Sequence, residues 1–185
     1  SGLAVNTRMG RWVGDAFVDV AVGDVDGDGR SDIIGRATDG TWWAEVSSAV
    51  GTGFTSQLMT RWSPSISWRD VRFGDIDGNG RTDVVGRTPG GQWWAAYARD
   101  TSVGYDSVPL GVWSPGIDWK SVVLSDFNFD GRLDIAGLAP ASSDSDAGTW
   151  WAGLTRASGI DNEVWGRFGL ADGVGLRATL STTTR

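Results

Sequence analysis

Three segments of the chain place oxygen-bearing side chains at positions 1, 3, 5 and 9 of a short, glycine-containing loop. The first segment runs Asp24-Val25-Asp26-Gly27-Asp28-Gly29-Arg30-Ser31-Asp32, and its counterparts begin at Asp75 and Asp126, each 51 residues after the one before. Calcium takes about six to eight oxygen ligands, often from alternate residues of a tight loop. Glycine at the sixth position permits the turn that brings the carbonyl of the seventh residue to the metal. The spacing therefore predicts a Ca²⁺ site in each loop.

The expected ligands stand at loop positions 1, 3, 5, 7 and 9, with each arginine contributing its backbone carbonyl. They are Asp24, Asp26, Asp28, Arg30 and Asp32; Asp75, Asp77, Asn79, Arg81 and Asp83; and Asp126, Asn128, Asp130, Arg132 and Asp134. A single loop of this kind would also fit a solvated acidic turn, because Asp-Gly is a common turn dipeptide. Three copies in register favour calcium, and magnesium fits less well because it retains more of its water ligands.

The elements that must hold these loops are short strands. Each loop is preceded by a segment such as 19–22 and followed by one such as 33–36, and a tryptophan pair and a further apolar segment come later in each unit. Four short strands per unit of about fifty residues are typical of a β-propeller blade. The fold class predicted is all-β, with propeller blades of four antiparallel strands. We expect repeats at approximately 13–62, 63–113 and 114–168, preceded by a spare outer strand near 5–12 and followed by a degenerate repeat or tail at 169–185.

The paired tryptophans recur at fixed places in each unit. They are Trp42 and Trp43, Trp93 and Trp94, and Trp150 and Trp151. Neighbouring residues on a strand point to opposite faces, so a blade covered on both sides can bury both members of a pair. The alternative is that these rings are exposed in grooves between blades and stack on a carbohydrate.

Composition excludes several classes of function. The chain contains no His and no Cys, which removes the commonest general base and any thiolate nucleophile or metal ligand. Its net charge of −7 argues against binding nucleic acid. The two glutamates, Glu45 and Glu163, do not recur in the repeat, so a catalytic carboxylate pair is not favoured. The recurrent Arg36 and Arg87 are expected to pair with loop carboxylates. No apolar segment is long enough to cross a membrane, and the first residues lack the features of a signal peptide.

The segment from Phe73 to Val85 and its two counterparts resemble the FG-GAP/VCBS repeat family, the calcium-binding blades of integrin α-subunit propellers and of many secreted bacterial proteins. The resemblance implies a propeller with calcium between the first two strands of each blade. It also implies an extracellular or cell-surface location and a non-catalytic role in adhesion or ligand binding. A propeller lectin and an accessory domain of a secreted hydrolase remain alternatives. The third loop departs from the family pattern at Asn128-Phe129, and we expect its site to bind calcium more weakly.

The number of repeats raises a question about assembly. Closed propellers contain about four to eight blades, whereas this chain has three. Three blades would leave an apolar face uncovered at each end. The sequence therefore predicts either a homo-oligomer, with a dimer of six blades favoured, or a larger parent chain. A glycan or a protein is the expected ligand.

Overall fold

The structure is a computed structural model that describes residues 17–48, 53–141, 147–170 and 176–179. These residues form β-strands in three antiparallel sheets, and no helix occurs among them. The first sheet contains β1 (Phe17–Gly23), β2 (Asp32–Ala37), β3 (Thr41–Ser47) and β4 (Phe54–Arg61). The second contains β5 (Arg69–Gly74), β6 (Asp83–Arg87), β7 (Gln92–Ala98) and β8 (Tyr105–Val112). The third contains β9 (Lys120–Ser125), β10 (Asp134–Ala139), β11 (Ala147–Arg156), β12 (Gly159–Leu170) and β13 (Leu176–Thr179).

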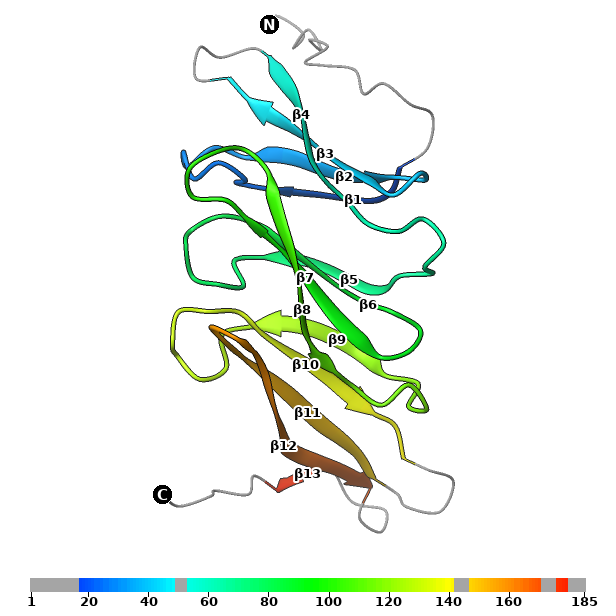
Figure 1. Ribbon diagram of the computed structural model, residues 1–185. Coiled ribbons are helices and arrows are strands. Elements are labelled where there is room, and N and C mark those ends of the chain that lie inside the picture. Colours follow the sequence, from blue (N-terminus) through cyan, green and yellow to red (C-terminus); the bar gives the residue numbers. More distant parts are fainter. Residues whose placement is uncertain (1–16, 49–52, 142–146, 171–175, 180–185) are drawn as a thin grey trace, which may run out of the picture.

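Each sheet is a meander in which neighbouring strands follow one another along the chain (Figure 1). The prediction of all-β blades with four antiparallel strands is confirmed. An acidic loop joins the first two strands of every blade, as expected. The third blade differs because β13, within the predicted tail, adds a fifth strand beside β12, from Arg167 opposite Thr179 to Leu170 opposite Leu176. The outer strand expected near 5–12 lies outside the described residues.

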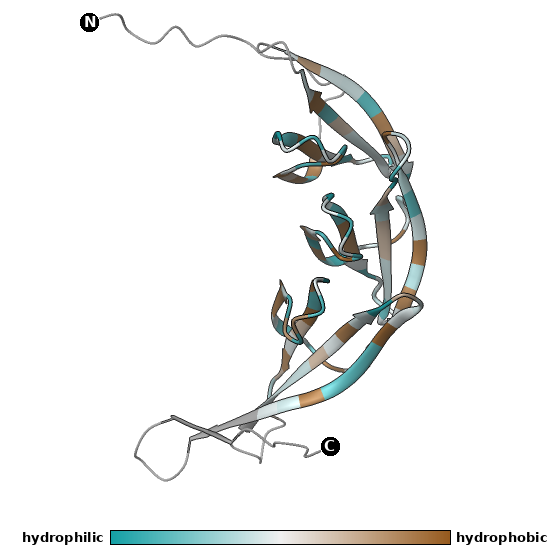
Figure 2. Ribbon diagram, turned by 90° about the vertical axis from the view of Figure 1, so that its left-hand side faces the viewer, coloured by the Kyte–Doolittle hydropathy of each residue, from teal (hydrophilic) through white to brown (hydrophobic). Residues whose placement is uncertain are grey.

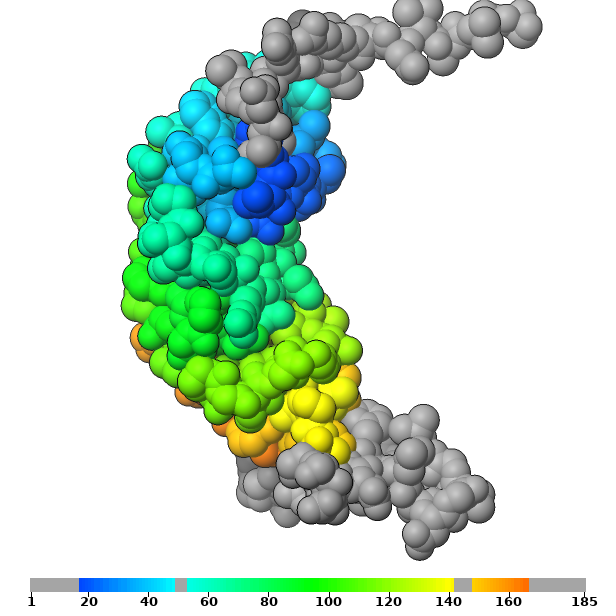
Figure 3. Space-filling model, turned by 90° about the vertical axis from the view of Figure 1, so that its right-hand side faces the viewer, coloured from blue at the N-terminus to red at the C-terminus, as the bar shows by residue number. Residues whose placement is uncertain are grey.

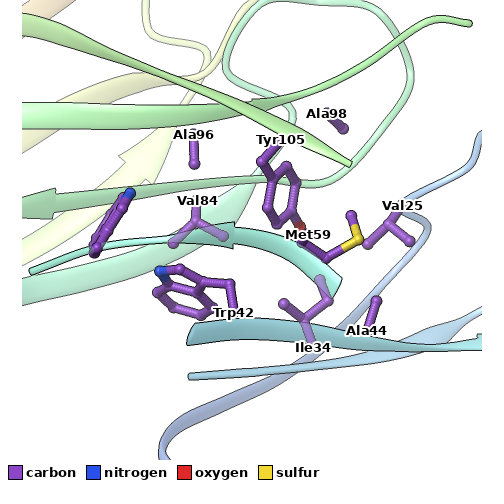
Figure 4. Close-up of a cluster of buried hydrophobic side chains, with 10 residues drawn as sticks. Val25, Ile34, Trp42, Ala44, Met59, Val84, Ala96, Ala98 and Tyr105 are labelled. Atoms are coloured by element: carbon purple, nitrogen blue, oxygen red, sulfur yellow. The ribbon is translucent and has the colours of Figure 1, made fainter. Parts of the chain in front are cut away.

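The three blades follow one another along an arc (Figures 2 and 3). Apolar side chains fill the space between the first and second blades, where Trp42, Ile34 and Met59 meet Val84 and Tyr105 (Figure 4). A corresponding cluster lies between the second and third blades. The second blade is therefore covered on both faces, which is why all five residues of β6 are buried.

A tryptophan at the end of one blade packs over a glycine of the next blade. Trp62 meets Trp42 edge-on, with ring centroids 5.3 Å apart, and Trp113 meets Trp93 in the same way at 5.3 Å. A Cβ atom placed at Gly86 would lie 2.8 Å from Cζ3 of Trp62, and the equivalent distance from Gly137 to Trp113 is 2.7 Å. Glycine is required at both positions because any larger residue would displace the indole.

The recurrent arginines pair with the first strand of their own blade, so the expectation that they pair with loop carboxylates is wrong. Arg36 contacts Asp19 at 2.6 Å, and Arg87 contacts Asp70 at 2.6 Å. Asp19 lies opposite Arg36 in the β1–β2 pairing, and Asp70 follows Arg69, the residue opposite Arg87, at the point where the β5–β6 register shifts. The third blade has Ser121 and Leu138 at the equivalent positions and therefore lacks the charged pair.

Candidate metal centres

The first acidic loop folds around the carboxylate of Asp24. One oxygen of Asp24 accepts hydrogen bonds from the N–H groups of Gly27 at 2.6 Å and Asp28 at 3.3 Å, and the other accepts one from Gly29 at 2.8 Å. Gly27 and Gly29 have φ angles of 75° and 81°, which suit glycine. As a result, carboxylate oxygens of Asp24, Asp26 and Asp28 converge within 4.8 Å of one another.

The second loop repeats this geometry. Asp75 accepts hydrogen bonds from Gly78 and Gly80, both at 2.8 Å. Carboxylate oxygens of Asp75, Asp77 and Asp83 converge within 4.8 Å. Asn79 takes the place of Asp28, and its amide donates to Asp100 at 3.2 Å. Sequence reasoning missed Asp100, because it lies beyond the third strand and has no counterpart at the repeat spacing.

The aspartate at position 9 of each loop is buried and ties the loop to the third strand of its blade. Asp83 accepts a hydrogen bond from the Ile76 N–H at 2.8 Å and another from the Ala98 N–H at 2.7 Å. Asp32 and Asp134 make the same pair of contacts in their blades. All three aspartates have no exposed surface. Position 9 therefore has a structural role in addition to the ligand role predicted for it.

Several loop carboxylates have raised pKa values. Burial raises the pKa of Asp83 to about 7, and the charges of Asp77 and Asp75 add to this effect. Burial, with the neighbouring charges of Asp75 and Asp100, also raises the pKa of Asp77. In the first loop, burial and the charge of Asp28 raise the pKa of Asp26. Raised pKa values mean that the ionised carboxylates are unfavourably placed by themselves and would be stabilised by a cation.

Two effects oppose one another at Asp24. Burial by itself raises the pKa of this carboxyl, but the backbone N–H groups that donate to it together lower the pKa below its usual value. Asp24 is therefore held ionised by its own loop. A fixed, ionised carboxylate at position 1 is a suitable first ligand for a divalent cation.

The donor set fits calcium. The converging atoms are all carboxylate oxygens, which are ligands that a hard cation prefers. Two arginines lie close to the predicted ligands: Arg30 forms an ion pair with Asp28, and Arg156 contacts Asp130 at 3.2 Å. The two arginine side chains are each 41% exposed, so both pairs lie on the solvent side of the loops.

The third loop is less regular. Asp126 accepts hydrogen bonds from Asp130 at 3.2 Å and from Gly131 at 3.0 Å, but the amide nitrogen of Asn128 is buried without a hydrogen-bond partner. Phe129 stands where the other loops have glycine, with a φ of 60°. Convergence of three carboxylates is found in the first two loops and not in this one, within the part of the chain that the structure describes.

The tryptophan pairs divide between two environments. Trp42 and Trp93 are fully buried between blades, where they cannot contact a ligand. Their neighbours Trp43 and Trp94, on the opposite faces, are half-buried. In the third blade, Trp150 and Trp151 are both half-buried. Full burial was expected for both members of each pair, but only the first member is fully buried, and only in the first two blades.

Trp151 lines a small cavity between the second and third blades. The cavity has a volume of about 130 Å³, and Trp113, Trp119 and Asn162 form other parts of its wall. The indole N–H of Trp113 donates to the Asn162 side chain at 2.8 Å. This arrangement offers an aromatic surface beside an amide.

Comparison with known proteins agrees with the repeat seen in the structure. A family model described as an FG-GAP-like repeat matches residues 24–86 and 75–137. A search of curated proteins finds no match. Among the described residues, no helix has the length and apolarity needed to span a membrane. The two matched ranges together cover more than half of the chain, and the chain therefore belongs to the FG-GAP-like repeat family.

Proposed function

We propose that this chain is a non-catalytic, calcium-binding propeller module that serves adhesion or ligand binding outside the cell. The observation that carries the proposal is the convergence of three carboxylates within 4.8 Å in each of the first two loops. Bound calcium would neutralise these carboxylates and complete its shell with oxygens of the same loops. Family membership supports the same role, because FG-GAP repeats often bind Ca²⁺ and are typically extracellular.

Calcium at these loops would also strengthen the contact between blades. The carbonyl of Asp24 accepts a hydrogen bond from the Thr82 N–H at 2.6 Å, and that of Asp75 accepts one from the Leu133 N–H at 3.0 Å. Asp24 and Asp75, the first-position residues of the first two loops, are therefore each bonded to the loop of the next blade. A metal that fixes the loop also fixes this bridge, so binding and blade stacking stabilise one another.

The absence of catalysis is part of the proposal. Glu45 lies on β3 and accepts a hydrogen bond from Ser56 at 2.5 Å, whereas Glu163 lies on β12 in a different blade. The two glutamates therefore do not form a carboxylate pair. The aspartates that cluster are those of the calcium loops.

Thermal unfolding in calcium and in excess EGTA tests the proposal. A site filled at about 100 times its dissociation constant adds roughly 2.7 kcal/mol, so the melting temperature should rise by several degrees. Asp77→Asn removes one converging carboxylate and should reduce the calcium-dependent rise without lowering stability in EGTA. Asp106→Asn, at an exposed aspartate paired with Arg99, is the matched control and should leave the rise unchanged. Equal melting temperatures of the unmodified chain in calcium and EGTA would refute the metal role.

Carbohydrate binding is a second candidate, supported by the cavity beside Trp151. Aromatic faces next to amide groups suit sugar rings, which have apolar faces and polar edges. A glycan array probed in calcium would test it, with Trp151→Ala as the comparison. Absence of signal from the unmodified chain would remove this candidate and leave the calcium proposal intact.

A further inference from the structure

Each contact between neighbouring blades joins two different faces. We call the face toward the next blade along the chain the forward face, and the face toward the previous blade the rear face. Forward faces are represented by Val25, Trp42 and Met59 in the first blade and by Ile76, Trp93 and Leu110 in the second. These six side chains are at most 5% exposed. Both contacts within the chain are thus the same forward-to-rear pairing.

On the rear face of the first blade, the corresponding side chains are exposed among the described residues. In the second blade, rear-face residues Val71 and Phe73 pack into the cluster around Trp42. Their equivalents in the first blade, Val20 and Val22, are 56% and 67% exposed. Val71 and Phe73 are half-buried at the same two strand positions, so the more exposed Val20 and Val22 have the character of an interface surface.

The forward face of the third blade is also less buried than the forward faces of the other two blades. Its equivalents of Ile76 and Trp93 are Phe127 and Trp150, and both are half-buried rather than fully buried. Phe127 stacks edge-on against Trp165, with ring centroids 5.0 Å apart. The equivalent side chains of the second blade, Ile76 and Trp93, are fully buried by the third blade, so the forward face of the third blade is the less covered one among the described residues.

The hydrogen bonds between loops show the same polarity. The N–H of loop position 8 donates to the carbonyl of loop position 1 in the preceding blade, from Thr82 to Asp24 and from Leu133 to Asp75. At the two ends of the array the equivalent groups are the Ser31 N–H on the rear side and the Asp126 carbonyl on the forward side. The ends therefore match each other in hydrogen bonding as well as in apolar surface.

We propose that a second copy of this chain covers both ends, with the third blade of each copy packing its forward face on the rear face of the first blade of the other. The two contacts are alike and related by a twofold axis, and six blades lie within the range of about four to eight in closed propellers. The three blades follow a curve rather than a straight stack, as consecutive blades of a ring do (Figure 3). This inference goes beyond calcium binding, since it concerns the partner rather than the metal.

One position at the proposed contact differs from the contacts inside the chain. At Gly27 an added Cβ would lie 3.0 Å from Cζ of Arg81 in the next loop, whereas the third loop carries Phe129 at this place, 93% exposed. The residue equivalent to Arg81 at the ring closure is Arg30 of the partner subunit. A guanidinium over an aromatic face is favourable, so the partner's Arg30 would rest on the Phe129 ring.

Light scattering after size-exclusion chromatography of the 185-residue chain in calcium, over a range of micromolar concentrations, tests the closure. The expected mass is twice the chain mass of 19.7 kDa. Val22→Asp and Val20→Asp each place a charge on the open rear face and should give the mass of one chain. Both variants should still fold, because these valines are exposed within one copy, and the circular dichroism spectrum checks this.

Leu58→Asp is the matched control, because Leu58 is 55% exposed and its equivalents Pro109 and Val164 remain exposed although their blades are paired. This variant should keep the mass of two chains. A single-chain mass for the unmodified protein would overturn the inference and indicate that further blades of a longer polypeptide cover the ends. A mass that keeps increasing with concentration would overturn the closed ring. If Val22→Asp kept the mass of two chains, the assignment of the rear face of the first blade to the contact would be wrong. Repeating the mass measurement in EGTA shows whether the two chains associate without calcium, so that failure of the dimer and failure of the calcium proposal can be distinguished.

Discussion

Replacement of Gly86 by alanine tests how one blade is held against the next. The new methyl group would lie 2.8 Å from Cζ3 and 3.2 Å from Cη2 of Trp62. Non-bonded carbon atoms prefer about 3.5–4.0 Å, so the indole would have to move by roughly 0.7–1.2 Å. Trp62 is only 3% exposed and meets Trp42 edge-on, so it has little room to move.

The expected loss in the free energy of unfolding for Gly86→Ala is about 2 kcal/mol, since overpacking a well-filled core costs about 1–3 kcal/mol. The backbone is not the source, because Gly86 is not among the residues with positive φ. Trp62→Phe removes the ring atoms that the methyl group would meet. It also removes the N–H that donates to Ser107 at 3.1 Å, so alone it should cost about 3 kcal/mol. The double variant should lose at least about 1 kcal/mol less than the sum of the two single losses.

Urea unfolding followed by tryptophan fluorescence, at one protein concentration and in saturating calcium, measures these four free energies. Gly90→Ala is the control, because its added Cβ would have no neighbour nearer than 3.7 Å. It should change stability by less than about 0.5 kcal/mol. Losses for Gly86→Ala and Trp62→Phe that add within about 0.5 kcal/mol would refute the steric account. An equal loss for Gly90→Ala would show that glycine is needed for a general reason rather than for the indole.

Three further outcomes follow from charge and backbone geometry. Asp70→Ser should lower the free energy of unfolding in urea by about 3–5 kcal/mol, because the buried Arg87 would lose its carboxylate. Adding Arg87→Leu gives the serine and leucine of the third blade and should restore most of that loss. A single variant as stable as the double variant would contradict this reasoning. The Phe129→Gly variant should be about 1 kcal/mol more stable than the Phe129→Ala variant. Both variants lose the aromatic ring, but only glycine adopts the positive φ of this position without steric cost. Equal stabilities of the two variants would show that the loop backbone is not strained. In EGTA, stability should fall as pH rises from about 4 to about 7, because burial raises the pKa of Asp83 to about 7 from 3.8 and the folded state therefore binds the proton more tightly than the unfolded chain does. Asp83→Asn should flatten that slope in the same urea titrations, and an unchanged slope would assign it to another group.

The acidic loops could be predicted from the sequence because their geometry is local. The carboxylate of Asp24 folds the loop by accepting N–H groups three to five residues away, and Gly27 and Gly29 adopt the φ values that this turn requires. Repetition at a spacing of 51 residues then placed the same loop between the same two strands of each blade. The all-β fold followed from four short apolar segments per repeat, which need only neighbouring strands to pair.

Contacts between distant residues could not be predicted in this way. The partner of Arg87 is Asp70 rather than a loop aspartate, since the register of β5 against β6 decides which carboxylate is near. The buried aspartate at position 9 accepts a hydrogen bond from the third strand, as Asp83 does from the Ala98 N–H 15 residues away. The loop motif does not include that strand, so it could not predict this structural role. Asp100 joins the second loop for the same reason.

The sequence by itself determined the acidic loops and the repeated unit of short strands, because both depend on short-range spacing that recurs every 51 residues. Only the tertiary structure decided which tryptophans are buried. Trp42 is covered because the second blade stacks on the first, whereas Trp150, at the same place in its repeat, is half-buried, and no further blade stacks on it among the described residues. Burial of a side chain depends on what lies across an interface, and that neighbour comes from another part of the chain or from another molecule.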